Sequence, residues 1–150
     1  NELIADVLSL LRADSLLREL VIIRDFSPEL PPVFGDRVQL QQVVINLILN
    51  GAAAVKQMPT DRRRLVIRTE IPKESAVKVS ITDSGTGIGE QSTQTLFEPF
   101  YTTKPDGMGM GLAISQTIIK EHGGTIRASN HPEGGAVFAF TLPVHQGNLA

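Results

Sequence analysis

Apolar residues in the first third of the chain recur at intervals that predict two helices with a strand between them. Residues 1–17 have helical spacing, and the β-branched run at residues 20–26 is typical of a strand. Asp36 is followed three residues later by Gln39, which is the pattern of a helix N-cap. We therefore expect the second helix to cover residues 36–58 and to end before the next proline.

The rest of the chain predicts four strands in two hairpins, at residues 65–71 with 75–83 and at residues 125–129 with 136–143. A third helix, at residues 112–121, is expected between the hairpins and is followed by two glycines. Six of the 13 glycines lie in residues 84–111, which we interpret as a loop. Strands that pair in hairpins, rather than alternating with helices, indicate an α/β domain built in layers.

Composition narrows the possible classes of protein. The 150 residues are 41% hydrophobic and 20% charged, which fits one globular domain. The formal net charge is −2, so no basic surface is available for nucleic acid or for an anionic membrane. The absence of cysteine excludes disulfides, thiolate metal sites and a thiol nucleophile, and it fits a reducing compartment. The longest uncharged stretch, residues 38–55, carries five side-chain amides and is too polar to span a membrane.

The second predicted helix carries a stripe of amides on an otherwise apolar surface. Gln42, Asn46 and Asn50 recur every four residues and so lie on one face of the helix. A buried amide without partners costs about 1–3 kcal/mol, so this face must meet solvent, a polar partner or a ligand. Either the stripe is a solvated helix face, or an asparagine oxygen ligates a hard cation. Mg²⁺ suits the second alternative, because it accepts one or two protein oxygens and takes the rest from phosphates and water.

A carboxylate followed by alternating glycines comes at the end of the predicted strand at residues 75–83. Asp83 could accept a hydrogen bond from an exocyclic amine such as that of adenine. The glycines at every second position after it would let the backbone approach a flat base without a Cβ in the way. The alternative is an ordinary turn at the exit of a hairpin.

A second glycine-rich stretch lies immediately before the third predicted helix. Gly107, Gly109 and Gly111 precede Leu112, where that helix is expected to begin. The backbone N–H groups of such a loop and of a helix N-terminus form an anion site, for which a triphosphate is a natural ligand. The alternative is a flexible linker loop. Neither glycine cluster has the spacing of a P-loop or of a Rossmann dinucleotide site, so these two common nucleotide motifs are not expected.

Taken in order, five sequence motifs point to a family. They are residues 46–52 (Asn-Leu-Ile-Leu-Asn-Gly-Ala), 83–88 (Asp-Ser-Gly-Thr-Gly-Ile), 96–104 (Leu-Phe-Glu-Pro-Phe-Tyr-Thr-Thr-Lys), 107–112 (Gly-Met-Gly-Met-Gly-Leu) and 121–124 (Glu-His-Gly-Gly). This series resembles the N, G1, F and G2 boxes of the catalytic, ATP-binding domain of bacterial sensor histidine kinases, in the GHKL superfamily. The likeness extends from Asp6 to Pro143, which leaves residues 144–150 as a tail. It is strongest to kinases of the nitrogen-regulation and oxygen-sensing type.

The resemblance implies a Bergerat-type fold, a two-layer α+β sandwich with a mixed, largely antiparallel sheet and helices packed on one face. It also implies a site for ATP and Mg²⁺. Asn50 would ligate Mg²⁺, Asn46 would contact the phosphates or their bound water, and Asp83 would bind the adenine amino group. The other implied nucleotide-binding residues are Gly85, Gly87 and Ile88 at the base, Thr102, Thr103 and Lys104 between base and lid, and Gly107, Gly109, Gly111 and Leu112 at the lid. Asn46, Asn50 and Lys104 would also act in catalysis, with Lys104 pairing with phosphate.

The residue at position 46 separates two reaction classes in this superfamily. The related ATPases resemble this chain but carry a glutamate there, four residues before the Mg²⁺-binding asparagine, and it activates water. An amide cannot act as a general base, whereas a neutral imidazole is already nucleophilic, so Asn46 favours phosphoryl transfer to histidine. The alternatives are a GHKL ATPase that couples hydrolysis to conformational change, and a degenerate nucleotide-binding scaffold.

None of the three histidines of this chain has the context of the family's phosphoacceptor. His122 precedes two glycines, where it fits a helix end, and neither His131 nor His145 matches the acceptor pattern. We therefore expect a cytoplasmic catalytic domain, without nucleic-acid or membrane contacts of its own, from a longer protein that could be membrane-anchored. Its phosphoacceptor histidine would lie on a separate dimerisation domain and would pass the phosphate to the receiver domain of a response regulator. Gly51 departs from the family pattern, in which alanine is usual, and should weaken the helix.

Overall fold

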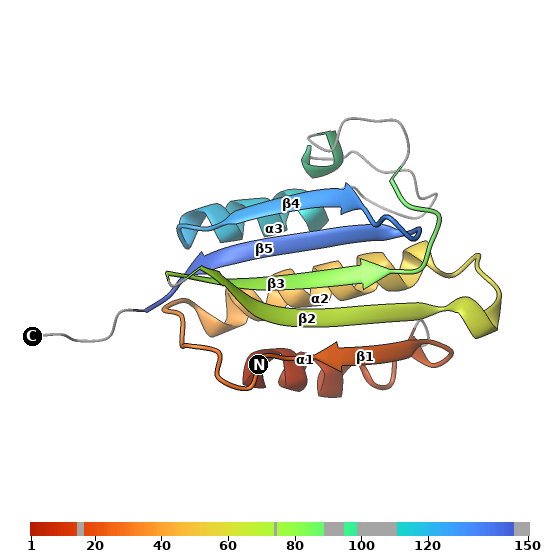
Figure 1. Ribbon diagram of the computed structural model, residues 1–150, viewed down its shortest axis with the longest axis horizontal. Coiled ribbons are helices and arrows are strands. Elements are labelled where there is room, and N and C mark those ends of the chain that lie inside the picture. The colour runs from red at the N-terminus through yellow and green to blue at the C-terminus, as the bar shows by residue number, and fades with distance from the viewer. Residues whose placement is uncertain (15–16, 74, 89–94, 99–110, 146–150) are drawn as a thin grey trace, which may run out of the picture.

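The computed structural model describes residues 1–14, 17–73, 75–88, 95–98 and 111–145. Over these residues the chain forms a five-stranded sheet with helices on one of its faces (Figure 1). The helices are α1 (Glu2–Leu11), α2 (Arg37–Ala54) and α3 (Gly111–Glu121), with short 3-10 helices at η2 (Thr60–Arg62) and η3 (Thr95–Phe97). The strands are β1 (Val21–Asp25), β2 (Arg64–Lys73), β3 (Ala76–Asp83), β4 (Thr125–Asn130) and β5 (Ala136–Pro143).

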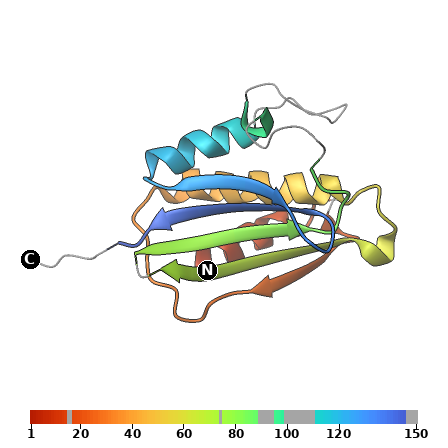
Figure 2. The same ribbon diagram turned by 45° about the horizontal axis from the view of Figure 1, so that its top comes forward.

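The sheet is mixed, as expected from the sequence. Its strand order is β1-β2-β3-β5-β4, in which β1 runs parallel to β2 and the other neighbouring pairs are antiparallel. Both predicted hairpins are present, β2 with β3 and β4 with β5. A second view shows α1, α2 and α3 on the same side of the sheet (Figure 2). The expected two-layer α+β sandwich is confirmed.

The core lies between α2 and the strands beneath it. Val43, Leu47 and Ile48 on α2 are at most 1% exposed, and so are Leu65 and Ile67 on β2. Fully burying an aliphatic side chain of this size contributes about 1.5–3 kcal/mol, so these contacts fix α2 over the sheet. Within the described part of the chain, every helix is too short or too polar to cross a membrane.

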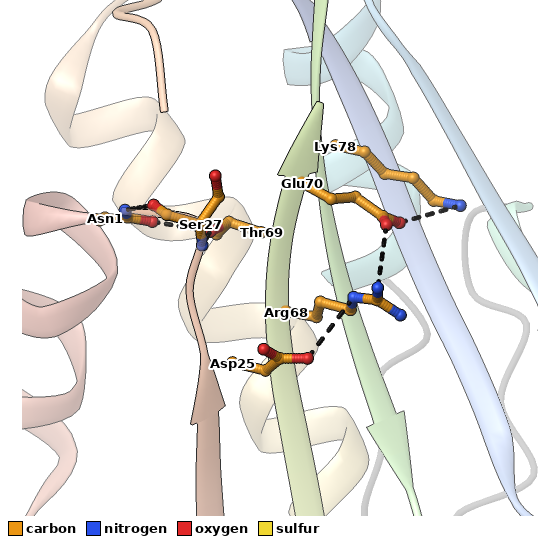
Figure 3. Close-up of polar contacts among 7 residues, drawn as sticks. All are labelled: Asn1, Asp25, Ser27, Arg68, Thr69, Glu70 and Lys78. Carbon is orange, nitrogen blue, oxygen red and sulfur yellow. Dashed lines mark hydrogen bonds and ion pairs between the residues drawn. The ribbon is translucent and has the colours of Figure 1, made fainter. Parts of the chain in front are cut away.

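The sheet face away from the helices carries a row of charged side chains. The guanidinium of Arg68 lies 3.5 Å from a carboxylate oxygen of Asp25 and of Glu70, and Lys78 Nζ lies 3.8 Å from Glu70 (Figure 3). These side chains are partly exposed, so each ion pair contributes little to stability. The charged row adds polar groups to this open face of the sheet, which also carries the exposed Val21 and Ile23 of β1, while Leu65 and Ile67 on β2 point to the helices.

The start of α1 is tied to β2 by a small hydrogen-bond network that Figure 3 also shows. Asn1, the residue before the helix, donates through Nδ2 to the carbonyl oxygen of Ser27 at 2.6 Å. Thr69, which is 3% exposed, donates to Asn1 Oδ1 at 2.8 Å and accepts from the N–H of Ser27 at 2.9 Å. The buried threonine hydroxyl on β2 is therefore fully used in fixing α1.

The helix α1 ends at Leu11, although the apolar spacing predicts it to residue 17. Leu16, which extended that spacing, lies outside the described residues, and the buried Leu17 beside it contacts the core from outside the helix. The N–H of Arg12 bonds to the carbonyl of Ser9, three residues back, so the last turn tightens and the helix stops. Apolar periodicity did not distinguish a buried residue on the helix from one in the turn that follows it.

The helix α2 also ends early, at Ala54 rather than at the predicted residue 58. The N–H groups of Lys56 and Met58 bond to carbonyls three residues back. The guanidinium of Arg63 donates to the carbonyl oxygens of Lys56 and Met58, at 2.8 and 2.9 Å. Arg63 thereby satisfies carbonyls that a continuing helix would otherwise have satisfied, and the chain turns before the proline.

The predicted tail begins later than expected. The N–H of Val144 donates to the carbonyl oxygen of Ser75, and the N–H of His145 donates to that of Pro32, both at 2.9 Å. These bonds anchor Val144 and His145, which we had predicted to belong to the tail, beside the hairpin of β2 and β3. Residues 146–150 lie outside the described residues.

Candidate functional site

The carboxylate of Asp83 is fixed by the backbone around it. Asp83 is the last residue of β3, a central strand, and it is 3% exposed. Its Oδ1 accepts hydrogen bonds from the N–H of Gly85 at 2.9 Å and from the N–H of Ala136 at 3.2 Å. Two donors from different segments hold the carboxylate in one orientation. The acceptor predicted for an exocyclic amine is therefore a buried group in a defined position.

Gly51 allows α2 to lie directly against the strands that lead to Asp83. A Cβ at Gly51 would be 2.7 Å from Leu65 Cδ2 on β2 and 3.7 Å from Cβ of Asp83. Alanine would therefore require the side chain of Leu65 to move, which favours glycine here in spite of its low helix propensity. Asn50, the residue before Gly51, is half-buried.

The stripe of amides on α2 is not a uniformly solvated face. Gln42 is exposed, but Asn46 and Asn50 are half-buried. The Nδ2 of Asn46 donates to the carbonyl oxygen of Gly111 at 3.2 Å and to Oγ of Ser115 at 3.3 Å. Asn46 thereby connects α2 with the first turn of α3. Its predicted contact with phosphate stays a prediction.

The segment after β3 depends on its glycines for close contacts. A Cβ at Gly85 would lie 2.7 Å from the carbonyl oxygen of Ala54, at the end of α2. Gly87 has a φ of +88°, and a Cβ there would lie 2.7 Å from Oδ1 of Asn130. Both glycines are required because the backbone of this segment packs against neighbouring polar atoms, and the left-handed conformation of Gly87 also disfavours other residues.

Asn130, the last residue of β4, was missed in the sequence analysis. Its Oδ1 accepts from the N–H of Ile88 at 2.6 Å, and its Nδ2 donates to the carbonyl oxygen of Ile88 at 3.2 Å. A polar side chain at the end of an edge strand gave no signal of this pairing, because the partner lies 42 residues away in the chain.

Gly135 is a second residue that the sequence marked only as part of a turn. It has a φ of +87°, and a Cβ there would lie 1.9 Å from the carbonyl oxygen of Asp83. No other residue type fits at this distance. The turn between β4 and β5 therefore packs directly against the backbone of the predicted base-binding residue.

Ser115 is a third missed residue. It is fully buried on α3, and its hydroxyl meets the side chain of Asn46. A single serine within the expected apolar face of a short helix was the available signal, because a buried hydroxyl needs a partner.

The described site residues come from α2, β3, the segment after β3 and the start of α3; the C-terminal ends of α2 and β3 and the start of α3 lie towards the same end of the sheet (Figure 1). These residues are Asn46 and Asn50 on α2, Asp83 on β3, Gly85, Gly87 and Ile88 on the segment after β3, and Gly111 and Leu112 at the start of α3. The first residue of α3 lies beside α2, since a Cβ on Gly111 would be 3.7 Å from Cγ of Asn46. The remaining predicted site residues, Thr102, Thr103, Lys104, Gly107 and Gly109, lie outside the described residues.

The ring of His122 forms hydrogen bonds that hold the fold together. Its Nδ1 lies 2.8 Å from the carbonyl oxygen of Ile118, to which it donates, and its Nε2 accepts from the N–H of Asp36 at 3.0 Å. Asp36 in turn caps α2 by accepting from the N–H of Gln39 at 3.0 Å, as predicted. His122 therefore joins the end of α3 to the start of α2, and both of its ring nitrogens are used.

A sequence model of the family described as "Histidine kinase-, DNA gyrase B-, and HSP90-like ATPase" matches residues 35–146. The match includes α2, the end of β3 and the start of α3, from which the site is built. The chain belongs to this family of ATPase domains. Within the family it is a catalytic ATP-binding domain of the sensor histidine kinase type, as its relatives and the solved structures like it show.

Two curated relatives illustrate the likeness. The sensor protein TdiS of Thauera aromatica is 38% identical over 145 residues, which are 96% of this chain and 26% of TdiS. The sensor protein FixL of Bradyrhizobium diazoefficiens is 42% identical over 116 residues, which are 77% of this chain and 23% of FixL. The chain thus spans about a quarter of the length of these relatives.

Solved structures agree with the assignment. The catalytic domain of the histidine kinase ThkA superposes with a TM-score of 0.83 at 34% identity, over 96% of this chain and 91% of that one. The mycobacterial sensor histidine kinase MprB gives a TM-score of 0.81 at 28% identity, over 96% of this chain and 93% of that one. The layered fold and the family assignment therefore rest on independent comparisons of sequence and of structure.

Proposed function

We propose that this chain binds Mg·ATP and transfers the γ-phosphate to a histidine on a separate dimerisation domain of the same protein. From that histidine the phosphoryl group passes to an aspartate in the receiver domain of a response regulator. The observation that carries the proposal is the approach of α2 to both neighbours: a Cβ on Gly51, the residue after Asn50, would lie 3.7 Å from Cβ of Asp83, and Asn46 bonds to the first residue of α3. A nucleotide needs such a combination, with a base acceptor on one side and amide oxygens for a metal-bound triphosphate on the other.

The base side of the site favours adenine. A carboxylate that is held by two backbone donors presents acceptor oxygens to the exocyclic amine of adenine. Guanine carries a carbonyl oxygen in the corresponding position, which a carboxylate repels. Glycine at position 85 keeps a Cβ away from the Asp83 carboxylate, since a Cβ there would lie 3.1 Å from Oδ1.

The residues of α2 fit a magnesium ion that is shared with a nucleotide. Among the described residues there is no cluster of three or more histidine or carboxylate side chains that could hold a metal by itself. An asparagine oxygen such as that of Asn50 is a suitable hard ligand, and Mg²⁺ commonly takes few protein ligands and several from phosphates and water. When bound, the ion would neutralise charge on the phosphates during transfer.

The reaction requires positioning rather than a strong base. A neutral ring nitrogen of the acceptor histidine would form the P–N bond while the bond from the γ-phosphorus to the bridging oxygen breaks and ADP leaves. The other ring nitrogen would then release its proton to water. Asn46 cannot remove a proton from water, so hydrolysis lacks the general base that it needs. The amide of Asn46 instead holds α3 beside α2.

A response regulator as the partner is supported by a relative. The histidine kinase ThkA has been solved in complex with the response regulator protein TrrA, and this chain superposes on that kinase with a TM-score of 0.79 at 33% identity. The proposal extends that partnership to the full-length protein from which this domain comes.

The decisive experiment follows the phosphoryl group. The full-length protein is incubated with Mg·ATP that is radiolabelled at the γ-phosphate. We expect a protein-bound label that is stable in base and labile in acid, as a phosphoramidate is. Release of inorganic phosphate without such a label would favour a hydrolysing ATPase, and the failure to bind ATP with Mg²⁺ would favour a nucleotide-independent scaffold.

A further inference from the structure

The hairpin turn between β4 and β5 contacts both ends of residues 83–88, which carry the predicted base-binding residues. At one end, the N–H of Ala136 donates to Oδ1 of Asp83 at 3.2 Å. At the other end, the side chain of Asn130 forms two hydrogen bonds with the backbone of Ile88. Asn130 and Ala136 are themselves paired in the β4–β5 register. One turn therefore holds the segment at both of its ends.

The side chain of Asn130 pairs with Ile88 in the way that a neighbouring strand would. Its Oδ1 accepts from the N–H of Ile88 at 2.6 Å, and its Nδ2 donates to the carbonyl oxygen of the same residue at 3.2 Å. β4 is an edge strand, so the backbone of Ile88 is bonded by a side chain at the border of the sheet. The left-handed Gly87, whose missing Cβ would lie 2.7 Å from Oδ1, leaves room for this contact.

The turn that presents Asn130 is itself hydrogen-bonded. The N–H of His131 donates to the carbonyl oxygen of Gly135 at 2.9 Å, and the N–H of Gly134 donates to that of His131 at 3.0 Å. The N–H of Glu133 donates to Nδ1 of His131 at 3.1 Å. The hydrogen-bonded turn and the end of β4 therefore hold Asn130 in a fixed position, as a residue that positions another segment requires.

We propose that Asn130 is a positioning residue for nucleotide binding, which holds the base-side segment in place through Ile88. This inference rests on the proposed function, because it concerns the adenine side of the same site. Asn130 has no need to touch the nucleotide. It keeps the backbone between Asp83 and Ile88 in the conformation that the base requires. The segment is then already ordered before the nucleotide binds, and binding does not lose free energy in ordering it.

The two hydrogen bonds to Ile88 explain why asparagine is suited to position 130. Only a side-chain amide of this length offers one acceptor to the N–H and one donor to the carbonyl of Ile88. Alanine offers neither. Aspartate keeps the shape and the acceptor, but it turns a second oxygen towards the carbonyl oxygen of Ile88. Both Asn130→Ala and Asn130→Asp should therefore release Ile88.

The test combines amide hydrogen exchange by NMR with calorimetric titration of ADP. In Asn130→Ala and Asn130→Asp, the Ile88 amide should exchange faster, while the Ile81 amide in β3 stays protected. The Kd for ADP should rise about tenfold, because two hydrogen bonds of roughly 1 kcal/mol or less each no longer preorganise the segment. Ser129→Ala removes a neighbouring polar side chain on β4 that pairs in register with Val137, and it should change neither measurement.

The outcomes separate this inference from the proposed function. Unchanged exchange of the Ile88 amide in both variants overturns the inference, as does faster exchange with an unchanged Kd. Asp83→Asn is titrated alongside as a reference for the base site. If Asp83→Asn loses ADP while the Asn130 variants bind normally, the proposed function stands and the inference fails. If Asp83→Asn binds ADP like the unmodified protein, the assignment of the base site fails and the role of Asn130 fails with it. Asn130→Asp, which preserves volume, remains informative if Asn130→Ala does not fold.

Discussion

The side-chain amide of Asn46 donates a hydrogen bond to the carbonyl oxygen of Gly111, 3.2 Å away. Gly111 is the first residue of α3, and the same amide reaches the buried hydroxyl of Ser115 one turn later, at 3.3 Å. A residue that was predicted for its chemistry with phosphate thus also joins two helices. The position of α3 therefore depends on the same side chain that, by the family resemblance, separates kinases from ATPases.

Asn46→Ala should lower the free energy of unfolding by about 1–2 kcal/mol, because it removes two hydrogen bonds and leaves the buried hydroxyl of Ser115 without its amide partner. Urea denaturation measures the change. Gln42→Ala is the matched control, since Gln42 lies on the same stripe but is exposed, and its substitution should stay within about 0.5 kcal/mol. Equal losses in the two variants would contradict a bridging role for Asn46.

Asp83→Asn should abolish most of the stabilisation by nucleotide. Saturation with Mg·ATP at about 100 times Kd adds about 2.7 kcal/mol to the stability of a binding protein, which a thermal melt detects. An asparagine that keeps its oxygen towards the N–H groups of Gly85 and Ala136 turns its NH₂ group towards the adenine amine, where an acceptor is needed. Asp25→Asn changes a carboxylate on the outer face of the sheet and should keep the full shift. A normal shift in Asp83→Asn would refute the adenine assignment.

Asn50→Ala should remove the dependence of ATP binding on Mg²⁺. In the unmodified protein we expect tighter binding with Mg²⁺ than with EDTA, because the ion bridges the nucleotide and the asparagine oxygen. In Asn50→Ala the two titrations should give similar affinities. Gln42→Ala, two turns earlier on the same helix face, should retain the difference. Full Mg²⁺ dependence in Asn50→Ala would assign the ion to other ligands.

Gly51→Ala should destabilise the protein, although alanine is the better helix former. The added Cβ would lie 2.7 Å from Leu65 Cδ2, and overpacking of this kind costs about 1–3 kcal/mol, against a gain of about 1 kcal/mol in helix propensity. A double-mutant cycle with Leu65→Ala tests the cause. If the contact is responsible, Gly51→Ala should cost less in the background in which Leu65 is already shortened. If the stability losses of Gly51→Ala and Leu65→Ala are additive, the contact with Leu65 is not the cause of the destabilisation.

Periodicity was sufficient for the layers of the fold, whereas the roles of the predicted site residues stay predictions. Alternation along residues 75–83 predicted the second strand of the central hairpin, and the spacing of Gln42, Asn46 and Asn50 predicted an amide stripe on α2. These features depend on short-range spacing, which a sequence displays directly. The same reasoning predicted the N-cap at Asp36.

The supporting contacts could not be predicted, because they join segments that are distant in the chain. Asn130 meets Ile88 across 42 residues, and Asn46 meets Ser115 across 69. The early end of α2 has a similar cause, since the turn that follows it is held by the side chain of Arg63. No local pattern encodes such partners. The reason for glycine at position 51 likewise became visible only when Leu65 was placed against it.

Two adjacent glycines in the β4–β5 turn allow the contact with Asp83 to be tested separately from backbone conformation. Gly134 and Gly135 both have positive φ, of +104° and +87°. A Cβ on Gly134 meets nothing within 4 Å, so Gly134→Ala should cost only the left-handed conformation, about 1–2 kcal/mol. A Cβ on Gly135 would lie 1.9 Å from the carbonyl oxygen of Asp83, so Gly135→Ala should cost about 1–3 kcal/mol more.

The two variants should also differ in nucleotide binding. Gly135→Ala has to displace the backbone of Asp83 or open the turn, and either movement disturbs the carboxylate that Ala136 holds. Its Kd for ADP should rise, whereas Gly134→Ala should bind ADP normally at a temperature at which both are folded. Calorimetric titration beside urea denaturation gives both quantities. Equal affinities would show that the carboxylate of Asp83 keeps its position when the turn moves, and that the turn serves stability alone.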